Sequence, residues 1–420
     1  MSKKIKILTI SDHPLSPSGV GTQTKYMIEG LLKTGRFQVV SLGGAVKHQN
    51  YQPMKTEEWG DDWTIFPIDG YGNAEIVRSV LRNEKPDILW FMTDPRFFGW
   101  LWKMEDEIRP LVPMVYYHVW DNYPPPKFNR LAYDSTDVIV TISKLTDEIV
   151  NIVAKEAEVI HLPHAVNTEI FKKVDSETIA EFKNENLKKF NNSEKMIFFW
   201  NNRNARRKQS GTLIFWFKDF LDRIGHDKAA LLMHTDPKDM HGQDLEAIVN
   251  ELGLNQGQVM FSKDKISAEG LSLLYNMSDC TINISDAEGF GLATLESLAC
   301  EIPIIVNMTG GLQEQATDGE NWFGFGISPS SRAIIGSQDI PWIYEDRING
   351  DEFVDTLEKF YNLSEKERHE MGTQGREHVI KNYSFERYQT EWDRVLTDVY
   401  EKYGSWDSRK NYKSWRLEEL

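Results

Sequence analysis

Residues 285–296 read Ser285-Asp286-Ala287-Glu288-Gly289-Phe290-Gly291-Leu292-Ala293-Thr294-Leu295-Glu296. The apolar run 280–284 before them is typical of a buried strand, and residues 293–298 have the spacing of a helix. A strand that passes through a small-residue loop into a helix is the building unit of a parallel sheet. Because the free amides at such a helix start attract anions, the stretch predicts a ligand-binding strand–loop–helix unit.

Two carboxylates lie on either side of this predicted helix start. Glu288 is in the small-residue loop, and Glu296 is one to two turns into the helix. Ionised carboxylates only accept hydrogen bonds, so the pair is suited to sugar hydroxyls that flank a bound phosphate. An exposed helix position is the alternative for Glu296, although Leu295 and Leu298 beside it are apolar.

The alternation of strands and helices extends through both halves of the chain. In the first half we expect strands at 5–10, 38–42, 64–67, 87–91, 114–117, 138–142 and 159–162, with helices at 22–33, 75–83 and 144–155. In the second half we expect strands at 196–200, 230–234, 259–261, 280–284 and 304–307, with helices at 212–223, 245–252, 268–276 and 293–298. This alternation predicts a parallel sheet, covered on both faces, in each half.

A stretch rich in Lys, Glu and Asn, 172–194, separates the two halves. We therefore predict an N-terminal Rossmann-like domain at 1–170, a linker and helix at 171–194, a second Rossmann-like domain at 195–383, a C-terminal helix at 384–403 and a tail at 404–420. Residues 324–350 carry Pro, Ser and Gly, and we expect an irregular insertion or long loop there before a helix at 352–361.

Composition restricts the class of protein. The net charge of −16 argues against nucleic acid as the main partner, because affinity for the phosphate backbone needs clustered Lys and Arg. Two cysteines, Cys280 and Cys300, indicate neither a disulfide framework nor a zinc site and fit a reducing compartment. The run 5–10 favours a first strand over a signal peptide, and no apolar run of about 18 residues predicts a transmembrane helix.

Four cations gather in Asn202-Arg203-Asn204-Ala205-Arg206-Arg207-Lys208, directly after the first strand of the second half. Open α/β sheets bind ligands at the carboxyl ends of their strands. In a chain this acidic, the cluster is suited to a diphosphate, which Arg binds bidentately and Lys binds as a point charge. A solvated basic loop is the alternative interpretation.

Two glycine loops follow other predicted strands. Ser18-Gly19-Val20-Gly21 joins the first strand to a helix, and Thr309-Gly310-Gly311 follows the strand at 304–307. Glycines let a backbone approach a ligand closely, and a helix start favours an anion. An ordinary turn explains either loop as well, and the dinucleotide spacing GxGxxG is absent from the first.

Together these residues resemble the retaining glycosyltransferases of family four, which have the GT-B fold. In that family a Ser precedes an E-x7-E signature by three residues, and Ser285, Glu288 and Glu296 match this pattern. Arg203 and Lys208 have the spacing of the family's diphosphate-binding Arg and Lys. The match continues at Ala299-Cys300, Pro303, Gly310-Gly311, the segment from Leu162 to Asn167 with Phe171, and Ser18–Gly21.

The chain also departs from the family's pattern at four positions. Ala165, Gln209 and Glu301 stand where Gly is usual, and Asn167 stands where Asp is usual. These changes remove none of the charges proposed to contact the ligand. They indicate a divergent member of the family.

The resemblance implies an α/β fold of two Rossmann-like, doubly wound parallel-sheet domains that face a cleft, with the C-terminal helix crossing back to the first domain. It implies that Glu288 contacts the hydroxyls of the transferred sugar and that His118 is a second catalytic residue, although a lone His is often structural. It also implies that Glu296 holds the donor ribose. The remaining implied contacts are Arg203, Lys208, Gly21, Gly291 and Leu292 to the donor diphosphate, and Gly289 and Phe290 in the sugar loop.

The implied activity is a retaining, hexosyltransferase-like transfer from a nucleotide-diphosphate sugar to an acceptor hydroxyl on a glycan, a lipid-linked or a protein-linked carrier. No DxD-like pair stands out, so we expect no metal, and we expect no other cofactor. The reducing compartment indicated above predicts a cytoplasmic enzyme. The helix start, Arg203 and Lys208 can stabilise the leaving diphosphate electrostatically. A nucleotide-sugar epimerase of the same fold and a non-catalytic carbohydrate-binding protein are the alternatives.

Two aromatic segments have no assigned role. Trp90-Phe91, Phe97-Phe98, Trp100 and Trp102 are suited to sugar stacking or a lipid contact, but we favour core packing. The tail 406–416 mixes Trp and Tyr with Arg409, Lys410, Lys413 and Arg416. A peripheral contact with the inner face of an anionic membrane is one interpretation of the tail, and a surface helix packed by its aromatics is the one we favour.

Overall fold

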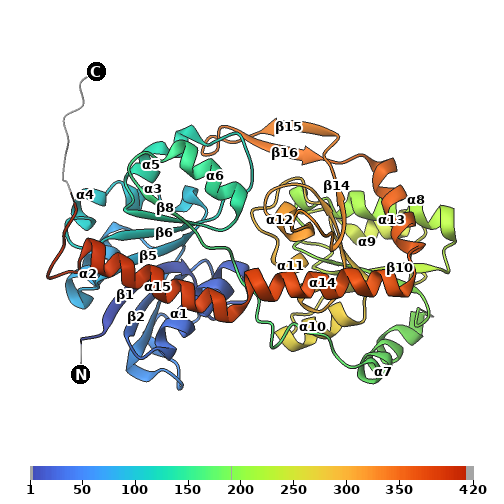
Figure 1. Cartoon of the computed structure of the whole chain (residues 1–420), viewed down its shortest axis with the longest axis horizontal. Coiled ribbons are helices and arrows are strands. Elements are labelled where there is room, and N and C mark those ends of the chain that lie inside the picture. Colours follow the sequence, from blue (N-terminus) through green and yellow to red (C-terminus); the bar gives the residue numbers. More distant parts are fainter. Residues whose placement is uncertain (1–2, 191, 413–420) are drawn as a thin grey trace. The chain divides into compact units, whose positions relative to one another are not determined.

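The computed structural model describes residues 3–190 and 192–412, and the chain forms two compact units (Figure 1). Unit 1 comprises the described residues up to Ala165, together with 336–342 and those from Phe385 onward. Unit 2 comprises 166–335 and 343–384. Each unit has its own sheet and its own apolar core.

Unit 1 contains an eight-stranded sheet in the order β3-β4-β2-β1-β5-β6-β7-β8. Neighbouring strands are parallel except β3 and β4, which are antiparallel. The strands are β1 (Ile5–Asp12), β2 (Phe37–Gly44), β3 (Met54–Lys55), β4 (Trp63–Pro67), β5 (Ile88–Thr93), β6 (Met114–His118), β7 (Val138–Thr141) and β8 (Glu158–His161). Strands β1 and β5 are neighbours, so the strand order reverses between them.

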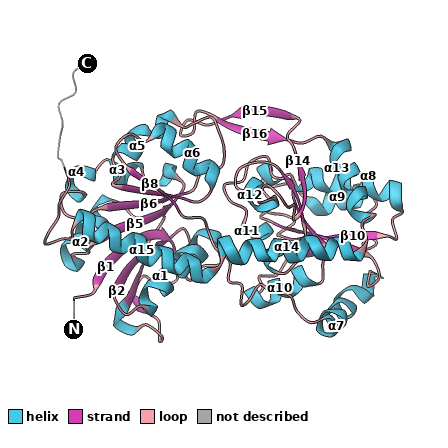
Figure 2. Cartoon of the chain, viewed as in Figure 1, coloured by secondary structure: helices cyan, strands magenta, loops and turns pink. Residues whose placement is uncertain are grey.

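Helices cover this sheet: α1 (Gly19–Lys33), α2 (Ala74–Glu84), α3 (Gly99–Trp102), α4 (Glu105–Ile108), α5 (Arg130–Asp134), α6 (Lys144–Val153) and α15 (Phe385–Tyr403) (Figure 2). The last of these packs on α1, where the Tyr388 hydroxyl donates a 3.2 Å hydrogen bond to the carbonyl of Gln23. Trp392 is fully buried against Trp90 and Tyr117. The helical spacing of aromatics in α15 therefore completes the core of unit 1.

Unit 2 contains a six-stranded parallel sheet in the order β11-β10-β9-β12-β13-β14. Its strands are β9 (Met196–Asn201), β10 (Ala229–His234), β11 (Val259–Ser262), β12 (Cys280–Asn283), β13 (Ile304–Asn307) and β14 (Gly324–Ile327). An antiparallel hairpin, β15 (Ser331–Ile335) and β16 (Ile343–Arg347), follows. Its helices are α7 (Ser176–Leu187), α8 (Ser210–Ile224), α9 (Leu245–Glu251), α10 (Ala268–Asn276), α11 (Leu292–Ala299), α12 (Leu312–Ala316), α13 (Gly350–Tyr361) and α14 (Glu365–Tyr383).

The predicted α/β class, with a parallel sheet in each of two units, is confirmed. Core packing is also confirmed for Trp90, Phe91, Phe98 and Trp102, which are 0–8% exposed, whereas Phe97 is 48% exposed. Both cysteines are free and buried. Within the described ranges, no helix is both long enough and apolar enough to cross a bilayer.

The expectation of an irregular stretch at 324–350 is wrong, because β14, β15 and β16 lie there. Gly324 allows β14 to pair with β13: a Cβ on it would lie 1.9 Å from the carbonyl oxygen of Ile304. The hairpin was missed because its strands, Ser-Arg-Ala-Ile-Ile and Ile-Tyr-Glu-Asp-Arg, do not alternate apolar and polar residues. An apolar alternation of the kind that marks a strand is therefore weak there.

Two other parts of the C-terminal region differ from expectation. Helix α14 was not expected, because its mean composition is polar, although a capping box between Ser364 and Glu367 marks its start. The described part of the tail contains no helix after Tyr403. Trp406 packs against the core of unit 1, and Arg409 is buried beside Asp137, 2.9 Å away. Lys413 and Arg416 lie outside the described residues.

Candidate active site in unit 2

The strand order of unit 2 reverses between β9 and β12. Ligands of open α/β sheets bind beyond the carboxyl ends of the strands at such a reversal. Two loops start at this point: 202–209 follows β9, and 284–291 follows β12. They carry the basic cluster and the E-x7-E signature, so the topology brings the two most informative motifs of the sequence together.

The two loops are joined by an ion pair between Lys208 and Glu288. These residues are 8% and 9% exposed. The guanidinium of Arg207 lies 3.7 Å from the same carboxylate and donates a 2.6 Å hydrogen bond to the carbonyl of Ala287. Burial alone would raise the pKa of Glu288, but the two cations outweigh it and lower that pKa. Glu288 is therefore an ionised carboxylate held by two cations.

Main-chain hydrogen bonds fix the loop that carries Glu288. The amide of Asp286 donates to the carbonyl of Arg207 at 2.8 Å, and the amide of Gly311 donates to the carbonyl of Glu288 at 3.0 Å. A Cβ on Gly311 would lie 2.6 Å from the Cα of Phe290, so this position needs glycine. The Gly310-Gly311 pair is thus a tight turn that supports the signature loop.

Glu296 lies on α11 and is half-buried. The hydroxyl of Tyr275 donates a 2.7 Å hydrogen bond to its carboxylate and accepts one of 2.8 Å from Asn201. Burial raises the pKa of Glu296 to about 7, and the bond from Tyr275 opposes this rise. Glu296 therefore changes charge near neutral pH, unlike Glu288.

The start of α11 has no side-chain cap among the described residues. Gly291, with φ of +95°, precedes Leu292 at this helix end. The first amides of a helix attract anions when no cap occupies them. Gly289 and Phe290 precede this helix start in the loop, where the carbonyl of Phe290 accepts a 2.8 Å hydrogen bond from Gln315.

Arg203 differs from the other predicted cations. It forms an ion pair with Asp239, with Nε 2.6 Å from the carboxylate, and its side chain is 62% exposed. The structure thus places Arg207, not Arg203, beside Glu288. The family's spacing of five residues between Arg and Lys pointed to Arg203 and did not indicate Arg207. A role for Arg203 in binding the diphosphate stays a prediction.

Buried polar atoms without a hydrogen-bond partner among the described residues lie just after two neighbouring strands. Asn202 Nδ2 and Thr235 Oγ1, after β9 and β10, are buried and have no hydrogen-bond partner in the part of the chain that the structure describes. No role was predicted for either residue from the sequence. Buried polar groups are normally paired, so these two are candidates to contact a bound ligand.

Gly21 and His118 belong to unit 1. Gly21 lies in the first turn of α1, where its amide donates a 2.9 Å hydrogen bond to the N-cap Ser18, and a Cβ on it would lie 2.8 Å from the carbonyl of His13. His118 ends β6, is fully buried, and its Nε2 lies 2.6 Å from the Tyr133 hydroxyl. Burial lowers its pKa to about 3, so it is neutral. The assigned roles of both residues stay predictions.

Comparisons with known proteins point to the family that the sequence motifs resemble. Residues 182–378 match the model of the family described as glycosyl transferases group 1. Sucrose-phosphate synthase from Thermosynechococcus elongatus has a similar structure, with a TM-score of 0.75 at 16% identity over 95% of this chain and 100% of its own. A glycosyltransferase from Rickettsia africae gives 0.70 at 16% identity, over 95% and 99% of the two chains.

HepE from Anabaena, solved in complex with UDP-glucose, gives a TM-score of 0.69 at 14% identity over 94% of this chain and 100% of its own. Likeness at these identities shows a shared fold, and that fold is the predicted GT-B fold. No curated protein sequence matches the chain significantly.

Proposed function

We propose that this chain, in which residues 182–378 match the model of the group 1 glycosyl transferases, moves a sugar from a nucleotide-diphosphate donor to an acceptor hydroxyl with retention of anomeric configuration. The observation that carries the proposal is the buried Lys208–Glu288 pair, with Arg207 beside it, at the strand reversal of unit 2. In a chain of net charge −16, this places two cations where an anionic ligand of such a sheet binds.

The chemistry requires charge stabilisation at the leaving group. When the bond between the sugar C1 and the diphosphate oxygen breaks, negative charge develops on the diphosphate. Lys208, Arg207 and the open amides at the start of α11 supply positive charge for it, with Arg203 as a further cation. Removal of one such donor typically costs about 100- to 1000-fold in turnover. The proposed transfer therefore needs no metal ion.

Glu288 and Glu296 have separate parts in this proposal. Glu288, ionised and fixed by two cations, accepts hydrogen bonds from hydroxyls of the transferred sugar. Glu296, beside Tyr275, accepts them from the ribose of the donor. In the retaining step a new bond forms between C1 and the acceptor oxygen on the face from which the diphosphate leaves. The acceptor proton then passes to the departing diphosphate oxygen.

UDP-glucose is the first donor to test, because the structurally similar HepE was solved with it. The purified protein is incubated with UDP-glucose and, in parallel, with other nucleotide sugars, each with a panel of sugar acceptors. We expect a single donor to raise the melting temperature and to release its nucleoside diphosphate in an acceptor-dependent reaction. NMR of the product should show the donor's anomeric configuration.

The same incubation separates the rival functions. An epimerase would isomerise the donor sugar without an acceptor, and a binding protein would be stabilised by a sugar but release no nucleotide. Addition of EDTA tests the metal-independent mechanism: we expect turnover to stay within about twofold, which is small against the change expected on losing one catalytic cation. Loss of turnover in EDTA that Mg²⁺ or Mn²⁺ restores would contradict that mechanism.

A further inference from the structure

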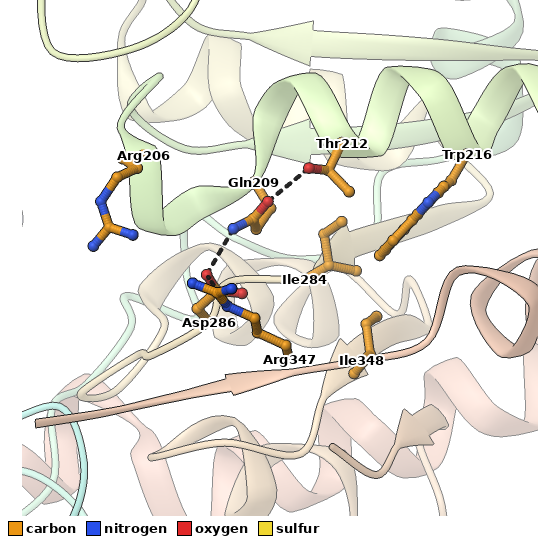
Figure 3. Close-up of a pocket in the computed structure, with 8 residues that line it drawn as sticks. All are labelled: Arg206, Gln209, Thr212, Trp216, Ile284, Asp286, Arg347 and Ile348. Atoms are coloured by element: carbon orange, nitrogen blue, oxygen red, sulfur yellow. Dashed lines mark hydrogen bonds and ion pairs between the residues drawn. The ribbon is translucent and has the colours of Figure 1, made fainter. Parts of the chain in front are cut away.

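Unit 2 contains a pocket beside the loops of the candidate active site (Figure 3). Its volume is about 370 Å³, within the size range of small-molecule sites. Residues from the start of α8, from the end of β12 and from the end of β16 line it. None of the residues that line this pocket was assigned a role in binding the donor.

The two loops divide their side chains between the active site and this pocket. On the first loop, Arg207 and Lys208 contact Glu288, whereas Arg206 and Gln209 line the pocket. On the second loop, Glu288 takes part in the active site, whereas Asp286 lines the pocket. A ligand in the pocket would therefore touch both loops without occupying the donor's contacts.

One end of the pocket is polar (Figure 3). The side-chain amide of Gln209 donates a 2.6 Å hydrogen bond to Asp286, whose side chain is 4% exposed, and the Nε of Arg347 lies 3.8 Å from that carboxylate. Arg206 and Arg347 both also pair with the buried Glu345. Two cations thus meet two carboxylates, so this end offers hydrogen-bond donors and acceptors without a net charge that would select an ion.

The other end is apolar and closely packed. The indole of Trp216 faces this end together with Ile284 and Ile348. Helix α13 supports the indole: Phe353 lies against it with ring centroids 5.6 Å apart, and a Cβ on Gly350 would lie 2.6 Å from its Nε1. A flat aromatic surface opposite charged groups that balance one another suits a neutral ligand that has an apolar face and several hydroxyls.

We propose that this pocket, between Trp216 and the Asp286–Arg347 pair, is a second carbohydrate site that takes one neutral pyranose unit. The C–H face of the sugar packs on the indole, and its hydroxyls donate to Asp286 and accept from Arg347 and Gln209. The raised pKa of Asp286, about 6 because of burial, still leaves a carboxylate at neutral pH.

Saturation-transfer NMR with D-glucose, D-galactose and D-mannose, each added alone, tests this proposal on the full chain. We expect at least one hexose to bind the wild-type protein. Trp216→Leu, which removes the flat surface but stays apolar, should weaken that binding at least about tenfold, and so should Asp286→Asn. Phe215→Leu is the matched control, because Phe215 is the neighbouring residue on α8, is 48% exposed and does not line the pocket.

Lys208→Ala separates this pocket from the active site. Hexose binding that persists in Lys208→Ala supports the second site, and binding that this substitution abolishes places the sugar in the active site and overturns the proposal. The proposal also fails if no hexose binds the wild type, or if Asp286→Asn binds as tightly as wild type. If Trp216→Leu does not fold, hexose binding by Asp286→Asn alone decides whether the sugar occupies this pocket. Donor turnover without any hexose binding would sink this inference alone and leave the proposed function standing.

Discussion

Lys208 and Glu288 form an ion pair in which each side chain is 11% exposed, although they lie on loops that follow different strands. Burial makes such a pair sensitive to the loss of one partner, because the remaining charge is left uncompensated. The pair therefore links the stability of unit 2 to the charges that we assign to catalysis, and single and double substitutions can separate these two contributions.

Lys208→Met and Glu288→Leu, made singly, should each lower turnover by at least about 100-fold and destabilise the protein by about 3 kcal/mol. The double variant should recover most of the stability, because two apolar side chains replace two buried charges, yet it should stay inactive. Urea unfolding and donor turnover check both parts. A double variant that regains turnover would contradict the catalytic assignment.

Glu296 predicts a pH dependence of donor binding. Its pKa is about 7 in the free protein, and only the carboxylate form accepts hydrogen bonds with both oxygens. Donor affinity should therefore rise about tenfold between about pH 6 and about pH 8, the change expected when one group with that pKa must ionise. Titration calorimetry measures this change.

Two variants control for other titrating groups. Glu296→Gln should bind the donor weakly and without this pH dependence, whereas Asp286→Asn should keep it. The folded pKa of Glu296 is raised above its ordinary value of 4.5, so its ionisation also costs stability. Protonated Glu296 therefore contributes stability that is fully present below about pH 4.5 and is lost as the pH rises through 7. A donor affinity that falls with rising pH would refute the assigned role.

Strong apolar runs predicted the sheet strands well. The strands from β4 to β13 lie within about two residues of their predicted ends, because buried parallel strands are continuous apolar segments. The hairpin β15–β16 was missed because its residues do not alternate apolar and polar, and helix α14 was missed because it is mostly polar. Periodicity cannot reveal elements of this kind.

The candidate site was predictable as a set of motifs but not as a set of contacts. The E-x7-E signature and the basic run indicated the two loops, since both follow buried strands. Which of the neighbouring cations faces Glu288 depends on the turn at 206–209, where Gln209 has φ of +57°. On this turn Arg207 and Lys208 face Glu288, whereas Arg203 pairs with Asp239, and no spacing rule contains this information.

Gln209 and Glu301 stand where the resembled family has glycine, and both keep a positive φ, +57° and +62°. Glu301 directly follows the C-cap of α11, a position that favours glycine. Its side chain pairs with Lys173 at 2.8 Å, which offsets part of the strain. Both residues therefore hold a backbone conformation that glycine adopts without strain.

Glu301→Gly should therefore be more stable than Glu301→Ala by about 1 kcal/mol, because both lose the pair with Lys173 but only glycine relieves the left-handed strain. Urea unfolding of both variants measures the difference. Lys173→Ala, which loses the pair with Glu301 and a 3.2 Å contact with His369, sets an upper limit on the cost of losing the ion pair and should cost less than about 1 kcal/mol. Equal stability of the glycine and alanine variants would mean that the backbone relaxes at this position.

We expect a substitution of Gly372 on α14 to destabilise the protein, because a Cβ there would lie 1.9 Å from the carbonyl oxygen of Glu301. The two segments pack backbone to backbone, so Gly372→Ala should force them apart and lower the free energy of unfolding by about 1–3 kcal/mol. Gly270→Ala on α10 is the matched control, since its Cβ would lie no closer than 3.5 Å to any neighbour. There the loss of chain entropy in the unfolded state should raise stability by about 0.5–1 kcal/mol. Opposite signs for the same Gly→Ala change in two helices of unit 2 would show that α14 is held by close contact with the segment that follows α11, and a neutral Gly372→Ala would show that it is not.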